Sequence, residues 1–412
     1  EDNFDPDYKN DMGVKRVAYF DAQAQENRMK YSEMLLTWKN QYTEMTVGED
    51  PSLVLIDLEN ENQPSDMFSF AAQHDYYKRE LSTLLVDWLR REYGTDEAVI
   101  KAWTDNTGKK ALMDGESIEK GYIEIAASTK DYTDARRDDL IRFAFDLVID
   151  YGNRYTERLR NIGVKALIVP MTNFGSHAPT NAYAHAVAGD FTDIHSYWAG
   201  MSGSSFGTGS SGGDVCSAMD KNFRYFGGLA NSRVYGMPYI ISEWNISTTG
   251  AFASEANMLM ASYSLMQNWN PFCFAMHTDK FQIDFDYPDE IKKVESGLVY
   301  EDKNIMLNDL AVDCNPVKMG TLPAASMLFH RRDVKEADRG YYDRYGDNDY
   351  YDADAYLFPT DAGYAMIGKT GAMYDVKEYD ESKLDNDVLY LSKKAKKDET
   401  PFVSVTGEMS TD

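Results

Sequence analysis

The chain has 412 residues, of which 43% are hydrophobic, and a formal net charge of −26. This content can bury a sizeable core and excludes a globally disordered chain. The acidic charge argues against nucleic acid and against an anionic membrane surface as partners, because both attract clustered Lys and Arg. No apolar run reaches the roughly 18 residues that a membrane-spanning helix needs.

Helical and strand-like patterns alternate along the first 335 residues. Apolar residues at helical spacing predict helices over 19–40, 81–94, 138–161, 253–268 and 322–330. Met29, Tyr31, Met34, Leu35 and Trp38 form the apolar positions of the first helix. Strand-like runs lie at 53–58, 164–169, 191–197, 238–243 and 271–276, and the run 164–170 is typical of a buried strand.

This alternation is typical of an α/β protein with a parallel sheet and crossover helices. The sheet can close in two ways, as an open doubly wound sheet or as a (β/α)8 barrel. Five strand-like runs are present, whereas a full barrel needs eight.

The composition of the sequence changes after about residue 335. The stretch 340–358 is rich in Tyr and Asp. Short strand-like runs follow at 354–358, 364–368, 387–391 and 402–405. We therefore divide the chain into an α/β domain, residues 1–335, and a small β-rich domain, residues 336–412. The Gly/Ser-rich stretch 199–214 directly follows a strand, where an active-site loop and a surface linker are both reasonable.

Polar residues stand where four of the strands end, which is where parallel α/β proteins place their chemistry. The first strand ends in Glu59-Asn60-Glu61-Asn62, and the second is followed by Asn173. The third strand carries His195 and Tyr197, and the fourth ends in Ser242-Glu243.

Glu61 and Glu243 form the carboxylate pair that we expect to act. Glycoside hydrolysis needs one carboxyl group that protonates the leaving oxygen and a second that attacks the anomeric carbon or activates water. Their environments must separate the two pKa values, so that one group is protonated and the other ionised.

Neighbouring residues fit the same chemistry. Asn60 can donate a hydrogen bond to a sugar hydroxyl, and His195 and Tyr197 can hold the second carboxylate. Trp198 and Trp244 offer flat faces for sugar rings. A single Glu at a strand end is usually a surface or capping residue, so the prediction depends on the conjunction of these motifs in this order.

The motifs resemble those of a known group. "ENEN" after an apolar strand resembles the Asn-Glu acid/base motif of the fourth strand in clan A glycoside hydrolases, and "YIISEWN" resembles their seventh-strand nucleophile. The segments "DIHSYW" and "LMQNWNPFCF" are similar to a cellulase-like or β-galactosidase-like branch of that clan. The resemblance covers roughly residues 19–335.

The resemblance implies a TIM barrel and a retaining double displacement. By residue, Glu61 is the acid/base with Asn60 beside it, and Glu243 is the nucleophile with His195 and Tyr197 in support. Retention implies carboxyl groups roughly 5–5.5 Å apart. The predicted strands then match strands four to eight, so the barrel is incomplete. We expect such a chain on its own to be poorly stable and inactive, because its first strand exposes an edge.

Other classes remain open or are disfavoured. A non-catalytic carbohydrate-binding barrel remnant is the alternative to an enzyme. A dinucleotide-binding protein is disfavoured, because "FGTGSSGG" lacks the strand-turn-helix context of G-x-G-x-x-G. The acids at 347–354 fail the calcium-loop pattern.

The sequence predicts no cofactor and no metal. It has three scattered cysteines, Cys216, Cys273 and Cys314, and no C-x-x-C. The chain begins at Glu1 without a signal peptide, so we expect a processed or excised start. Its compartment is open between secreted and cytoplasmic, with extracellular favoured. The sequence does not determine the oligomeric state.

Overall fold

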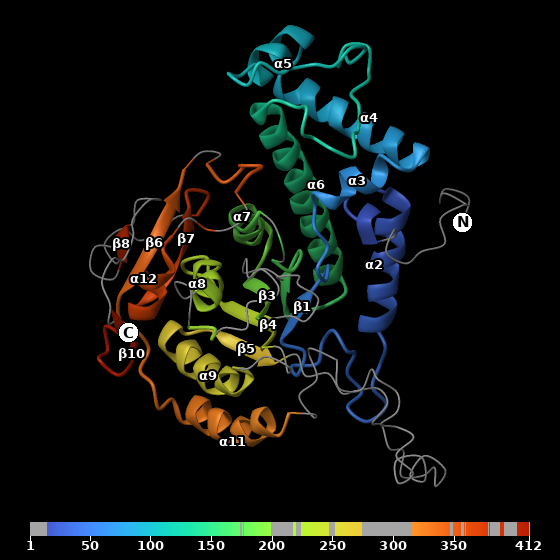
Figure 1. Ribbon diagram of the computed structural model, residues 1–412. Coiled ribbons are helices and arrows are strands. Elements are labelled where there is room, and N and C mark those ends of the chain that lie inside the picture. The colour runs from blue at the N-terminus through green and yellow to red at the C-terminus, as the bar shows by residue number, and fades with distance from the viewer. Residues whose placement is uncertain are drawn as a thin grey trace, which may run out of the picture. The chain divides into compact units, whose positions relative to one another are not determined.

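The computed structural model describes residues 15–173, 175, 177–198, 217–219, 224–246, 252–273, 315–346, 349–355, 358, 360–377, 379, 388–390 and 402–411 (Figure 1). The chain forms two compact units. Unit 1 comprises residues 1–191 and 346–356, and unit 2 comprises residues 192–345 and 357–412. The stretch 199–214, Cys216, Cys314 and residues 274–276 of the fifth predicted strand lie outside the described residues.

Unit 1 is mostly helical. Its helices are α2 (Ala22–Leu36), α3 (Asp66–Ala71), α4 (Asp75–Glu92), α5 (Asp96–Trp103), α6 (Asp134–Asn161) and α7 (Ala178–Ala188). Side-chain caps set where three of them begin, because a cap satisfies a backbone N–H that the first turn leaves open. Asp21 accepts from Ala24 N, Thr95 from Ala98 N and Thr133 from Arg136 N.

The long helix α6 confirms the predicted apolar stripe. Of the apolar positions predicted for this helix, five are buried and Leu147 is only half-buried. The buried positions are Leu140, Phe143, Tyr151, Tyr155 and Leu159. The helix predicted over 19–40 is confirmed as α2, but its apolar positions after Met29 are exposed and Trp38 lies beyond its end. Met29 is 5% exposed, whereas Tyr31, Met34, Leu35 and Trp38 are between 51% and 66% exposed.

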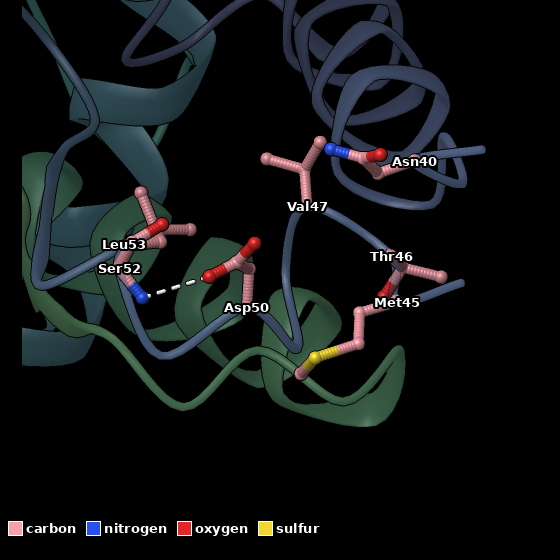
Figure 2. Close-up of a pocket in the computed structure, with 7 residues that line it drawn as sticks. All are labelled: Asn40, Met45, Thr46, Val47, Asp50, Ser52 and Leu53. Carbon is pink, nitrogen blue, oxygen red and sulfur yellow. Dashed lines mark hydrogen bonds between the residues drawn. The ribbon is translucent and has the colours of Figure 1, made fainter. Parts of the chain in front are cut away.

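A surface hollow of about 290 Å³ lies in the turn that follows α2 (Figure 2). Asp50 at its wall accepts a hydrogen bond from Ser52 N. The lining residues are Asn40, Met45, Thr46, Val47, Asp50, Ser52 and Leu53. None of them belongs to the polar tail that follows the first strand.

Two parallel strands run through unit 1. Strand β1 (Leu55–Asp57) pairs with β2 (Leu167–Val169), with Leu55 opposite Leu167. Leu58 N continues the ladder by donating to Val169 O at 3.1 Å. Both strands lie within the ranges predicted from the sequence.

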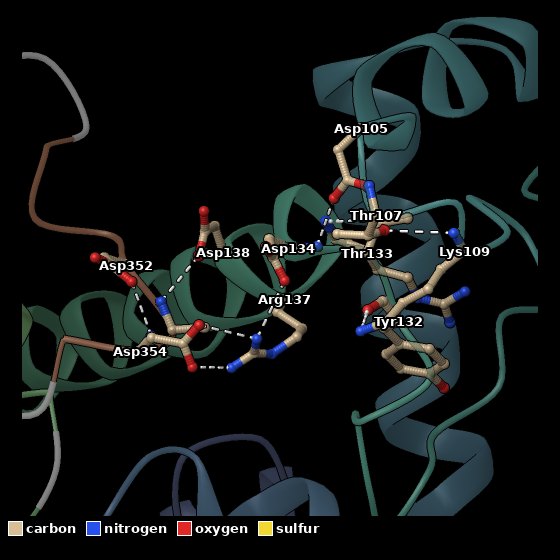
Figure 3. A network of polar contacts seen from close by, with 12 residues as sticks. Asp105, Thr107, Lys109, Tyr132, Thr133, Asp134, Arg137, Asp138, Asp352 and Asp354 are labelled. Carbon is tan, nitrogen blue, oxygen red and sulfur yellow. Dashed lines mark hydrogen bonds and ion pairs between the residues drawn. The ribbon is translucent and has the colours of Figure 1, made fainter.

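Segment 349–355 of unit 1 contacts α6 (Figure 3) and also α7. Arg137 pairs with Asp354, and Ala353 N donates to Asp138 Oδ1 at 2.8 Å. Tyr350 stacks on Tyr183 with ring centroids 3.9 Å apart. We call residues 349–355 the strap.

Unit 2 holds a three-stranded parallel sheet in the order β3-β4-β5. These strands are Thr192–Trp198, Tyr239–Ile246 and Asn270–Cys273. Helices α8 (Arg224–Asn231), α9 (Ala256–Gln267) and α11 (Pro316–Arg331) also belong to this unit. The predicted strands at 191–197 and 238–243 are confirmed, as are the predicted helices at 253–268 and 322–330.

The last part of unit 2 differs in detail from the prediction. Strands β7-β6-β8 form a parallel sheet, and β9 (Phe402–Val403) pairs with β10 (Ser410–Thr411) in an antiparallel ladder. The predicted strand at 364–368 is wrong, because helix α12 (Ala362–Ile367) occupies it with Asp361 as its cap. The strand at 354–358 is also wrong at its described residues. Strands β6, β7 and β8 are Gly340–Tyr345, Lys369–Tyr374 and Val388–Tyr390.

The structure therefore confirms a mixed α/β fold with parallel sheets. Each of the five strands predicted for the α/β domain has a counterpart among β1 to β5. The closure of these strands into an incomplete barrel, and the domain boundary at 335, stay predictions.

Candidate functional site

Strands β3 and β4 of unit 2 bring four polar side chains together. The register places His195 opposite Glu243 and Tyr197 opposite Asn245. Because side chains alternate along a strand, His195 and Tyr197 point to the same face. All seven residues of β3 are buried, whereas in β4 Ser242 and Glu243 are the only positions that solvent partly reaches.

A register shift explains why two consecutive residues of β4 serve this face. Asp193 pairs with Ile240 and His195 pairs with Glu243, so β4 has one residue more than β3 between these pairs. Such a bulge re-aims a side chain and is common beside active sites. Here it allows both Ser242 and Glu243 to contact residues of β3.

The Glu243 carboxylate has two contacts on β3. Tyr197 donates its hydroxyl hydrogen bond to Glu243 Oε2. His195 Nδ1 lies 3.4 Å from the same oxygen. The Glu243 side chain is 20% exposed and that of His195 is 2% exposed. The carboxylate is therefore held from the interior and open to solvent on another side.

Trp198 and Trp244 lie in the core of unit 2. They are 2% and 5% exposed and belong to one apolar cluster with Tyr225 and Phe226. Their predicted role as sugar platforms stays a prediction, and in this structure both rings are almost fully covered by core residues.

In unit 1, the two glutamates that follow β1, Glu59 and Glu61, have different surroundings. Glu59 is 1% exposed. Its carboxylate pairs with Arg28 Nη1 at 2.8 Å and accepts from the Tyr151 hydroxyl at 2.9 Å. Burial raises the pKa of Glu59, and the charge of Arg28 partly offsets that increase. Glu59 is thus a buried anchor and does not face solvent.

Asn60 and Glu61 lie differently. Asn60 is exposed and Glu61 is partly exposed, while Asn62 is again buried and donates to Lys15 O at 2.6 Å. The backbone of Glu61 has φ of 48°. That left-handed conformation is uncommon for a residue with a side chain and is found at functional sites more often than elsewhere.

Asn173, predicted from its place after the second strand, is buried at 1% exposure. Its Nδ2 has no hydrogen-bond partner among the described residues. The residue before it, Thr172, bonds to the Asp57 side chain and donates its N–H to Glu59 O at 3.1 Å. Asn173 therefore belongs to the neighbourhood of the β1 tail.

The structure thus groups the predicted residues in two sets. Glu243, His195 and Tyr197 are in contact within unit 2, and Asn60, Glu61 and Asn173 belong to unit 1. The predicted separation of roughly 5–5.5 Å between the two carboxyl groups stays a prediction.

Sequence reasoning assigned no role to Asp193 and Ser242. Ser242 Oγ lies 2.7 Å from Asp193 Oδ2 and 2.8 Å from His195 Nε2. Burial raises the pKa of Asp193, and the charge of His195 acts against this increase. The alternation Asp-x-His-x-Tyr in 193–197 is the sequence signal that was available, because it places three polar side chains on one face of a buried strand.

No family model and no curated protein matches the chain. Solved structures of β-galactosidases do. The enzyme of the haloarchaeon Halorubrum lacusprofundi superposes with a TM-score of 0.55 and 12% identity, over 90% of this chain and 52% of that one. The enzyme of Marinomonas ef1 gives 0.51 and 13%, over 90% and 59%. That of Rahnella sp. R3 gives 0.51 and 12%, over 90% and 50%.

The chain is similar in fold to these β-galactosidases. The resemblance to clan A glycoside hydrolases is thereby confirmed at the level of the fold. The chain spans between 50% and 59% of the length of these structures. Among the described residues, no helix is long and apolar enough to cross a membrane.

Proposed function

We propose that this chain belongs to a retaining glycoside hydrolase that cleaves β-linked bonds in oligo- or polysaccharides. The observation that carries the proposal is the Glu243 carboxylate of parallel strand β4, which is partly open to solvent and held by Tyr197 and His195. A carboxylate fixed from behind and open in front suits attack on an anomeric carbon.

Glu61 is the acid/base in this proposal. Three features of the β1 tail support it over Glu59: its partial exposure, the exposed amide of Asn60 beside it, and its left-handed backbone. Glu59 is already committed to Arg28 and Tyr151. Asn60 then binds a sugar hydroxyl, and Asn173 is a further amide near the same tail.

The reaction follows from these roles. Glu61 donates its proton to the leaving oxygen as Glu243 attacks the anomeric carbon, which forms a glycosyl ester on Glu243. Glu61, now ionised, takes a proton from water, and that water attacks the same carbon and releases Glu243. The β1–β2 pair and the β3–β4–β5 sheet act as strands four to eight of a TIM barrel in this proposal, with Glu61 after β1 and Glu243 in the carboxyl-terminal half of β4.

The test measures hydrolysis of 4-nitrophenyl β-glycosides by the purified chain and by any longer natural protein that contains it. Glu243→Gln keeps the shape of the side chain and removes the nucleophile, so turnover should fall by about 10³-fold or more. Glu336→Gln is the matched control, because Glu336 is an exposed acid of the same unit that pairs with Lys369. In a form of the protein that turns over the substrate, equal rates for wild type and Glu243→Gln would remove Glu243 from the mechanism.

A covalent trap gives a second readout. A 2-deoxy-2-fluoro β-glycoside with a good leaving group should add one sugar mass to the wild-type protein, on the peptide that contains Glu243. Sugar binding by all forms of the protein, with no turnover and no adduct, would instead support the alternative, a non-catalytic carbohydrate-binding protein.

A further inference from the structure

Four side chains of β3 and β4 form a continuous chain of polar contacts in unit 2. Asp193 Oδ2 lies 2.7 Å from Ser242 Oγ, which lies 2.8 Å from His195 Nε2. The other ring nitrogen, Nδ1, lies 3.4 Å from Glu243 Oε2. Asp193 and His195 are 1% and 2% exposed. This series of contacts therefore links the buried carboxyl group of Asp193 to the partly exposed carboxylate of Glu243.

Ser242 is fixed at the centre of this chain. Its backbone N–H donates to Asp193 Oδ1 at 3.0 Å while its hydroxyl contacts Asp193 Oδ2. Both carboxylate oxygens of Asp193 thus bind Ser242. The bulge in β4 directs this residue toward β3. The contact of Ser242 with Nε2 is shorter than that of Glu243 with Nδ1, so Ser242 is the stronger constraint on the imidazole.

With Glu243 ionised, as a nucleophile is, these side chains have two arrangements of their protons with the same total charge. In one, Asp193 is protonated and donates to Ser242, Ser242 donates to Nε2, and the neutral ring carries its proton on Nδ1. In the other, Asp193 is ionised and accepts from Ser242, which accepts from Nε2 of an imidazolium. In both arrangements Nδ1 carries a hydrogen that faces Glu243.

We propose that Ser242, held by Asp193, is a positioning residue that keeps the Nδ1 proton of His195 directed at Glu243. An Nδ1–H attracts the carboxylate and fixes it for attack, whereas an Nδ1 lone pair would repel it. This inference rests on the proposed role of Glu243 as nucleophile. Ser242 itself does not touch the reacting atoms.

The direct test is the protonation of the His195 ring, measured through its ¹⁵N chemical shifts. The protein has six histidines, so the His195 signals are assigned by their loss in a His195→Gln variant. In the wild type we expect a protonated Nδ1. In Ser242→Ala the Nε2 contact is gone, and we expect the tautomer with a proton on Nε2 to appear.

Two variants serve as controls. Ser242→Thr keeps the hydroxyl and should keep the wild-type shifts. Ser196→Ala removes a hydroxyl from the neighbouring strand, one residue from His195 and on the opposite face of β3. Ser196 is fully buried and its Oγ has no partner among the described residues. The ring signals should not change in this variant.

Kinetics add a readout that depends on the proposed function. Ser242→Ala should lower kcat by between about 10-fold and 10⁴-fold, the range seen when a supporting group or the tautomer of a catalytic histidine is lost, with a smaller change in KM. Unchanged ring shifts in Ser242→Ala overturn the positioning role whatever the activity. Altered shifts in a protein that cleaves no glycoside uphold that role in the protein and contradict the proposed function instead.

Discussion

Two glutamates separated by a single residue have opposite surroundings at the end of β1. Glu59 is buried against Arg28 and Tyr151, whereas Glu61 is partly open to solvent. Removing one partner of a buried ion pair costs about 3–5 kcal/mol, because the other partner loses its compensation. Arg28 is 27% exposed, so we expect Glu59→Ala to reduce the free energy of unfolding by the lower end of that range, about 3 kcal/mol, measured by urea denaturation.

Glu61→Gln should behave in the opposite way. A substitution at a partly exposed position without a change of shape alters stability by about 0.5 kcal/mol or less, while β-glycoside turnover should fall strongly if Glu61 is the acid/base. Glu59→Gln is the control, since the amide oxygen still accepts from Tyr151. A large stability loss in Glu61→Gln, with activity retained, would reverse the assignment of the two residues.

The strap and α6 form an element whose stability depends on pH. Asp138 accepts from Ala353 N at 2.8 Å, and burial raises its pKa to about 6, with Asp352 adding to the increase (Figure 3). A carboxyl whose pKa is raised from 3.8 in the folded state favours folding most when it is protonated. Its contribution is full below about pH 4 and is lost as pH rises through about 6.

Asp138→Asn should therefore stabilise the protein at pH 8 and leave its stability unchanged near pH 4. The gain is about 1 kcal/mol after allowance for solvent, since Asp138 is only half-buried. Chemical denaturation at both pH values measures it. Asp150→Asn, an exposed acid of the same helix that pairs with Arg154, should show no such pH-dependent gain. A destabilised Asp138→Asn at pH 8 would mean that the charge itself holds the strap.

Elements with a regular pattern were predictable from sequence, and those decided by tertiary contacts were not. The apolar stripe of α6 and the apolar runs of β2, β3 and β4 report burial directly, whereas β1 is only half-buried and Phe272 of β5 is exposed. The apolar residues on the exposed face of α2 have the same helical spacing as those of α6. Spacing alone therefore does not tell whether a neighbouring element covers a helix face. Segment 364–368 reads as a short strand, but Asp361 caps helix α12 there.

The candidate site shows the same division. The Asn-Glu and Glu motifs were found because they follow apolar runs. The buried state of Glu59 was not, because it depends on Arg28 and Tyr151, which are 31 and 92 residues away in sequence. The role of Ser242 depends on a bulge, and a bulge shifts the register by one residue without leaving a sequence signal of its own.

At the scale of the whole molecule, acids dominate the charge. Asp and Glu number 68 against 42 Lys and Arg. Some of these acids are paired, as in Arg158 with Glu26 and Glu33, but exposed pairs contribute about 1 kcal/mol or less each. The uncompensated charge of −26 repels itself within the folded state.

Salt should therefore raise the stability of this protein. The screening length falls from about 30 Å at 0.01 M to about 8 Å at 0.15 M, which weakens repulsion over most distances in the molecule. We expect the Tm at pH 8 to rise by several degrees between these salt concentrations, measured by calorimetry. At about pH 5, where carboxyl groups begin to take up protons, the same increase in salt should have a smaller effect. A Tm that falls with salt at pH 8 would show that the ion pairs outweigh the net repulsion.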